Sequence, residues 1–174
     1  PTLQLISALS IIENIKLIIV GVSSDIIIKY LDKTTSCNKN KIQIFDRCSN
    51  YLEIAKECDV AIDTFPFGGS ASLFDFSLAK IPIITFQKKP PFLYSFDEYS
   101  HSRSLNFPKE LVFNSPKSKL LIPFINKLKN DRQYCRKLGI ECSDMLYNQT
   151  RDAHVITKDY EEIFMKVIDN KILV

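Results

Sequence analysis

The chemically suggestive part of this chain is a short run of glycine and serine between two apolar segments. Gly68 and Gly69 are the only adjacent glycines among the four in the chain, and Ser70, Ala71 and Ser72 follow them directly. Glycine lets the backbone approach an anion closely, and serine hydroxyls donate hydrogen bonds beside the free amides of a helix's first turn. This order favours a phosphate-binding turn. The alternative is a plain glycine turn whose serines cap a helix.

The segments on either side of this run predict how it is held. VAI at 60–62 and PIITF at 82–86 are apolar, rich in β-branched residues and too short for helices, so we expect two buried strands. A short helix between them leaves the glycines at the carboxyl end of a strand, where α/β proteins bind phosphate. Asp75, inside that helix, can accept hydrogen bonds from a ribose diol. Asp63, at the end of the first strand, is expected to be structural and to bind turn amides.

The sequence motifs of several other well-known functional sites are absent from this chain. The chain contains neither GxGxxG nor GxxxxGK[ST], which excludes the dinucleotide fingerprint and the P-loop, and it contains neither GxSxG nor HExxH. No cluster of His, Cys and Asp has metal-ligand spacing, so we expect no metal and no cofactor. His101 and His154 stand alone and are expected to be surface or structural imidazoles rather than catalysts.

The order of the remaining segments predicts the fold. Helical spacing at 2–13, 26–31 and 51–58 alternates with apolar strands at 16–20 and 41–45. We therefore expect a Rossmann-like three-layer αβα sandwich with a parallel sheet of four or five strands, the last at 111–113. One domain is expected over 1–174. Its carboxyl-terminal part, 114–174, is expected to be helical, and the helices are predicted from Ser115, from Asp131 and from Lys158.

Bulk composition excludes several functional classes. The net charge of +3 is too small, and Lys and Arg are too scattered, for a nucleic-acid-binding face. Five cysteines without a CxxC pair favour a reduced, cytoplasmic setting over a disulfide framework. No apolar run approaches the roughly 20 residues of a membrane helix, and no signal peptide is visible. Because the chain opens on Pro1 rather than Met, we expect it to be cut from a longer polypeptide or to have a non-natural start.

The segment from Asp59 to Phe86, DVAIDTFPFGGSASLFDFSLAKIPIITF, resembles the C-terminal half of the catalytic region of O-GlcNAc transferase and its SPINDLY-like relatives. In that family the corresponding run forms the UDP-sugar site of a GT-B glycosyltransferase. The likeness continues in HSR at 101–103, in FPKELVFNSPKSK and NDRQYCRKL, and in DYEEIFMKVI. It thus extends over most of the chain from about Lys16.

This resemblance implies the donor-binding half of an inverting, metal-independent GT-B enzyme, with a UDP-sugar as the default donor. The family's threonine-rich turn is Ser-Ala-Ser here, so one hydroxyl is lost at Ala71. Arg47 lies beside Cys48, which replaces a family lysine, and Tyr51 stands where the family tends to have His. Arg103 either neutralises diphosphate charge or pairs with a nearby carboxylate. The implied nucleotide-sugar site comprises Gly68, Gly69, Ser70, Ala71, Ser72, Asp75, Arg47, Tyr51 and Arg103.

No catalytic residue is assigned within this chain. The resemblance implies that the acceptor side and the base belong to an N-terminal GT-B half, in the same chain or in a partner chain. Two other classes stay open at this point: a non-catalytic nucleotide or nucleotide-sugar binding module, and an unrelated flavodoxin-like domain used in protein interaction. Calorimetry with nucleotides and nucleotide sugars separates these possibilities. The glycosyltransferase half and the binding module are expected to bind a nucleotide, and the interaction domain is not.

Overall fold

The structure is a computed structural model of the whole chain. It describes residues 2–21, 23–33, 37–46, 48, 50–64, 72–86 and 107–150, together with residues 161 and 165. Helices and parallel strands alternate through most of this part, as expected for an α/β protein.

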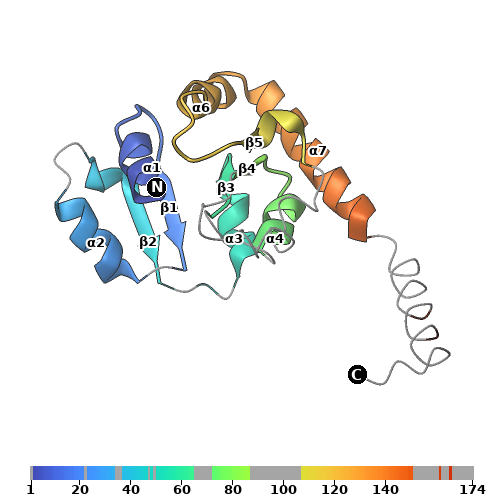
Figure 1. Ribbon diagram of the computed structural model, residues 1–174, viewed down its shortest axis with the longest axis horizontal. Coiled ribbons are helices and arrows are strands. Elements are labelled where there is room, and N and C mark those ends of the chain that lie inside the picture. Colours follow the sequence, from blue (N-terminus) through green and yellow to red (C-terminus); the bar gives the residue numbers. More distant parts are fainter. Residues whose placement is uncertain are drawn as a thin grey trace.

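The amino-terminal part forms a two-stranded parallel sheet with two helices packed against it (Figure 1). Its elements are α1 (Thr2–Ser10), β1 (Leu17–Val20), α2 (Ser24–Asp32), the 3₁₀ turn η1 (Lys39–Lys41) and β2 (Ile42–Phe45). Alternate side chains of β1 and β2 pack against Ile6 of α1 and against Ile27 and Leu31 of α2. Both strands lie where the apolar runs predicted them. Helix α1 is shorter than expected, because the chain turns through Asn14, whose φ is +57°.

The middle of the chain forms a three-stranded parallel sheet in the order β3-β4-β5. Its elements are α3 (Tyr51–Lys56), β3 (Ala61–Ile62), α4 (Ser72–Leu78), β4 (Ile83–Phe86), η3 (Lys109–Leu111) and β5 (Val112–Phe113). All four residues of β4 are buried, so the prediction of a buried strand at 82–86 is confirmed. Figure 1 shows α3 and α4 side by side next to these strands, and the last two helices of this part follow later in the chain.

Those last helices are α6 (Leu121–Asn130) and α7 (Arg132–Thr150). Asp131 was expected to begin the second of them, and its carboxylate accepts a hydrogen bond from the amide of Tyr134 at 2.9 Å, as an N-cap does. The first helix was expected to begin just after Ser115, which is wrong. The hydroxyls of Ser115 and Ser118 each accept a bond from the amide two residues further on, and these turns delay the helix to Leu121.

Helix α7 crosses the points where β3 and β4 begin. The thiol of Cys135 donates to the carbonyl of Asp59 at 3.5 Å, and the Arg132 guanidinium pairs with the Asp59 carboxylate. Further along, the helix packs so closely on the segment before β4 that a Cβ at Gly139 would lie 2.0 Å from the Lys80 carbonyl oxygen. Glycine is therefore what allows this crossing.

The five strands fall into two sheets rather than one. Among the described residues, β1 pairs with β2, and β3 with β4 and β5, so the expected continuous sheet of four or five strands is not formed. β3 is only two residues long and therefore offers few ladder hydrogen bonds to a further neighbour. The two sheets nevertheless share a core, because Leu5 and Leu9 of α1 belong to the same buried cluster as β3 and β4. The α/β class is confirmed.

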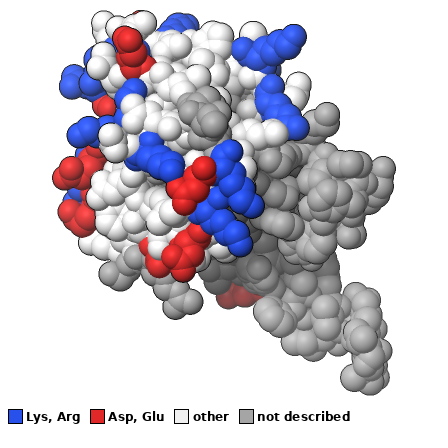
Figure 2. Space-filling model, turned by 90° about the vertical axis from the view of Figure 1, so that its left-hand side faces the viewer, with Lys and Arg blue, Asp and Glu red and all other residues white. Residues whose placement is uncertain are grey.

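Charged side chains are mixed rather than segregated on the face that carries α2. Figure 2 shows Lys and Arg interspersed there with Asp and Glu. The Lys39–Asp32 pair is an example, and more than half of each side chain is exposed. Such exposed pairs contribute little to stability. No helix in the described part of the chain is long and apolar enough to cross a bilayer.

Candidate functional site

The predicted nucleotide site is described only in part. Ser72, Asp75 and Tyr51 lie in helices of the structure. The other six predicted residues lie outside the described ones: Arg47, Gly68, Gly69, Ser70, Ala71 and Arg103. The geometry of the glycine turn itself is therefore still a prediction, and the site is built here from the elements on either side of it.

Helix α4 stands where the phosphate site requires a helix. β3 ends at Ile62 and α4 begins at Ser72, so the order strand, connection and helix is confirmed. Leu73 is fully buried and Asp75 is half-buried, so one side of the first turn is anchored in the protein while Asp75 keeps contact with solvent. An anchored first turn with a partly exposed carboxylate is compatible with a polar ligand beside it.

Tyr51 reaches the carboxyl end of β1. Gly21 ends that strand with φ of +85°, and its amide donates to the Phe45 carbonyl at 3.0 Å. A Cβ at Gly21 would lie 3.4 Å from the Tyr51 hydroxyl oxygen, so the two residues are neighbours although 30 positions apart. The family resemblance predicts Tyr51 as a site residue, but it does not predict that Tyr51 lies beside Gly21. In the sequence, Gly21 after the apolar run 16–20 indicates only where the strand ends.

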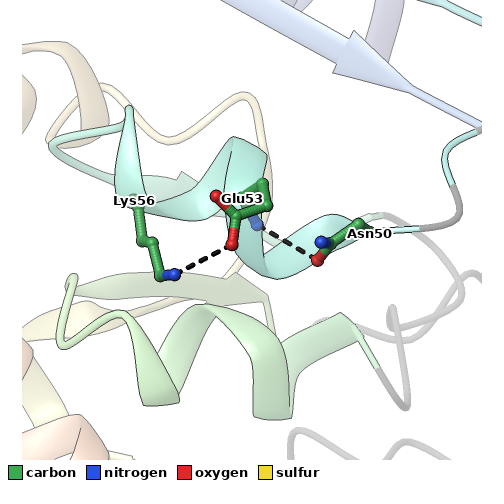
Figure 3. Close-up of polar contacts among 3 residues, drawn as sticks. All are labelled: Asn50, Glu53 and Lys56. Atoms are coloured by element: carbon green, nitrogen blue, oxygen red, sulfur yellow. Dashed lines mark hydrogen bonds and ion pairs between the residues drawn. The ribbon is translucent and has the colours of Figure 1, made fainter.

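The start of α3 holds Tyr51 in place (Figure 3). The side chain of Asn50 accepts a hydrogen bond from the Glu53 amide at 3.3 Å, and Lys56 pairs with the Glu53 carboxylate at 2.9 Å. Asn50 is thus the N-cap residue of α3. Because Tyr51 is the first residue of the capped helix, its backbone position is set by this cap.

The amino end of α2 is already occupied by a carboxylate of the chain. Ser23 is the N-cap residue of this helix, but its side chain makes no cap bond. Instead the Asp46 carboxylate, which follows β2, accepts a bond from the Ser24 amide at 2.7 Å. A carboxylate is favoured there by charge and by the helix dipole. This helix end is therefore satisfied internally, which leaves the α4 side as the candidate for an anion.

Two buried polar side chains lie at the carboxyl ends of β3 and β4. Asp63 is 6% exposed, and its carboxylate accepts from the Thr64 amide at 2.8 Å, so its expected structural role is confirmed. The Asp63 amide donates to the Ile84 carbonyl at 2.8 Å, which extends the β3–β4 ladder and sets Asp63 level with Thr85. Thr85 is fully buried, and its hydroxyl makes no hydrogen bond. Sequence reasoning counted Thr85 only as part of an apolar strand.

The cysteines are free thiols in buried or half-buried positions. Burial raises the pKa of Cys142 to about 11, and it also raises the pKa of Cys58 and Cys135, to which the nearby Asp59 charge adds. These three thiols stay protonated at neutral pH and are poor nucleophiles. In the described part of the chain, no three His, Cys, Asp or Glu residues come together as a metal site.

No protein-family model matches the chain, and no curated protein matches it either. A functional assignment therefore rests on the residues and on the arrangement of the elements around them.

Proposed function

We propose that this chain is the donor-binding domain of a cytoplasmic GT-B glycosyltransferase and that it binds a nucleotide-diphosphate sugar, with UDP-sugar as the default. The observation that carries the proposal is the unit from β3 to α4. A helix with an anchored first turn begins at Ser72, directly after the Gly-Gly-Ser-Ala sequence. The resemblance of 59–86 to the O-GlcNAc transferase family supplies the ligand class.

In this proposal, the amides of the turn and the hydroxyls of Ser70 and Ser72 stabilise the diphosphate as it leaves. Charge stabilisation of this kind on a departing group needs no metal. Asp75 accepts hydrogen bonds from the ribose. The acceptor and the general base are supplied by an N-terminal half in the same chain or in a partner, so no catalytic base is assigned here.

We also propose that the two sheets belong to one layer of a Rossmann-like sandwich. All five strands run parallel within their sheets, and α1 shares its core with β3 and β4. The approach of Tyr51 of α3 to Gly21, which directly follows β1, further ties the two parts together. Ligands of such sheets bind in the crevice at the carboxyl ends of the strands.

Isothermal titration calorimetry with UDP, UDP-GlcNAc and a GDP-sugar tests the proposal. We expect UDP and UDP-GlcNAc to bind and Asp75→Ala to weaken both by about 10- to 100-fold, because a hydrogen bond to a charged group is worth roughly 1.5–3 kcal/mol. Asp144→Ala, an exposed carboxylate on α7, is the matched control. Failure of every nucleotide to bind would refute the proposal. If the chain binds a nucleotide sugar but transfers no sugar when its proposed N-terminal half is present, the non-catalytic module is favoured.

A further inference from the structure

β1 and β3 are edge strands in the part of the chain that the structure describes. β1 pairs only with β2, and β3 pairs only with β4. All four residues of β1 are half-buried, whereas all four residues of β4, which has a partner on each side, are buried. Leu17 of β1 packs against the same buried cluster that holds β3, so the two edge strands border one core (Figure 1).

The backbone groups at the two free edges follow from the bonds on the other side of each strand. The Gly21 amide, directly after β1, donates to the end of β2 at 3.0 Å, and the Asp63 amide donates to β4 at 2.8 Å. Successive N–H groups of a strand point alternately to its two edges. The amides of Ile18, Val20 and Ile62 therefore point away from these partners, and such an edge is a template for a further strand.

The helices indicate on which side of β1 a preceding strand belongs. Ile6 of α1 packs in the same cluster as Ile27 and Leu31 of α2, so both helices cover one face of the β1–β2 sheet. α2 connects β1 to β2, and crossovers between parallel strands are right-handed. Since α1 leads into β1 on that same face, a parallel strand that precedes α1 lies on the side of β1 away from β2.

α1 also packs on the second sheet. Its Leu5 and Leu9 belong to the buried cluster that contains Ala61 of β3 and Ile83 of β4, so one helix spans the edges of both sheets. The observed orders β2-β1 and β3-β4-β5 match strands 3-2 and 4-5-6 of the order 3-2-1-4-5-6, which doubly wound sheets adopt. In that order, strand 1 lies between the two groups.

We propose that one further parallel strand inserts between β1 and β3, joins the two sheets into one, and is supplied by the polypeptide that leads into α1. A central strand of a parallel sheet is covered on both faces, so the supplied segment is a run of about five apolar, β-branched residues. β3 contributes few ladder bonds to it, because Ile62 is the one residue of that short strand whose amide points to this edge.

This inference rests on the proposal that the two sheets form one layer, and it gives the N-terminal half a role inside this domain. Ligands of doubly wound sheets bind at the carboxyl ends of the strands where the strand order reverses, which is between strands 1 and 4. The supplied strand therefore ends beside β3, from which the chain leads to the predicted glycine turn. The N-terminal half thus completes the crevice in which the donor is proposed to bind.

The experiment appends a strand to the chain 1–174. One protein carries a run of five valine and isoleucine residues and a glycine-serine linker of about four residues before Pro1, and a control carries glycine and serine throughout the same length. Amide hydrogen exchange is followed by NMR. In the unextended chain we expect the amides of Ile18 and Val20 to exchange faster than that of Ile19. The apolar extension should slow exchange at Ile18, Val20 and Ile62 by roughly tenfold or more and raise the melting temperature, and the polar extension should do neither.

Val20→Pro is a second control. It removes an amide donor at the free edge but no bond to β2, so it should cancel the slowing at Ile18 in the extended protein. If this variant does not fold, the two extensions decide without it.

Four results would overturn the inference: Ile18 and Val20 amides already protected in the unextended chain, no slowing by the apolar extension, equal slowing by the polar one, or slowing at β1 without Ile62. Slowing that appears only in a dimer, as measured by analytical ultracentrifugation, would assign the edge to a second copy and also overturn it. These measurements use no nucleotide, so their failure is distinct from failure of the donor site.

Discussion

Gly139→Ala should destabilise the protein, although the same change in most helices is stabilising. Gly139 lies inside α7, and there alanine is favoured over glycine by about 0.8–1 kcal/mol. The new Cβ would lie 2.0 Å from the Lys80 carbonyl oxygen and 2.7 Å from its carbon, and both are backbone atoms that cannot rotate away. The sign of the effect therefore depends on the crossing of α7 over the segment before β4.

The size of the effect follows from the displacement that is needed. Ordinary contact begins near 3.4 Å, so α7 or the Lys80 segment must retreat by roughly 1.4 Å from its 2.0 Å position. Overpacking costs about 1–3 kcal/mol and occasionally more, and the gain in helix propensity offsets at most about 1 kcal/mol. We expect a net loss of about 1–2 kcal/mol, which is a fall of roughly 2–8 °C in melting temperature for a chain of this size.

Urea unfolding followed by far-ultraviolet circular dichroism measures this loss. Ser143→Ala is the matched control, because it lies in the same helix at a half-buried position and should be neutral or slightly stabilising. A Gly139→Ala protein as stable as the wild type, or more stable, would show that α7 does not pack on Lys80 as described.

Three further predictions follow from the site. Gly21→Ala should cost about 1–2 kcal/mol in urea unfolding, because φ is +85° there and the Tyr51 hydroxyl leaves little room. A cost that vanishes would contradict this backbone conformation. Asp46→Ala should cost about 1 kcal/mol through loss of the bond from Ser24, whereas Asp25→Ala should cost less. Since burial raises the pKa of Cys142 to about 11, its thiol stays protonated in the folded state while the unfolded thiol ionises near 9. The free energy of unfolding should therefore fall between about pH 9 and 11, and Cys142→Ala should reduce that slope in urea titrations across this range.

Several features of the fold could be predicted because their causes are local. The run 82–86 is apolar and rich in β-branched residues, which describes a buried strand whatever surrounds it. Asn50 can cap a helix because its side chain reaches an amide three residues away. Asp63 was expected to hold a turn amide, and it holds the next one in the chain. In each case the interacting groups lie within about one turn of the chain.

Other features were missed or wrong because sequence patterns do not show which distant groups meet. Pro116 after Ser115 looks like the start of a helix, yet two serine turns delay α6. Nothing near Ser24 in the sequence indicates that its amide is bound by the carboxylate of Asp46, which directly follows β2.

The residue types and their order thus determine that this chain is an α/β protein and where a phosphate-binding turn is expected. The tertiary structure decided that the strands form two sheets, that the α2 amino end is filled and that Thr85 lies unpaired beside Asp63. The physical reason is the distance along the sequence over which each kind of interaction acts. Propensities and caps act over a few residues, whereas the pairing of strands and the burial of a hydroxyl depend on register and packing between segments that lie far apart in the sequence.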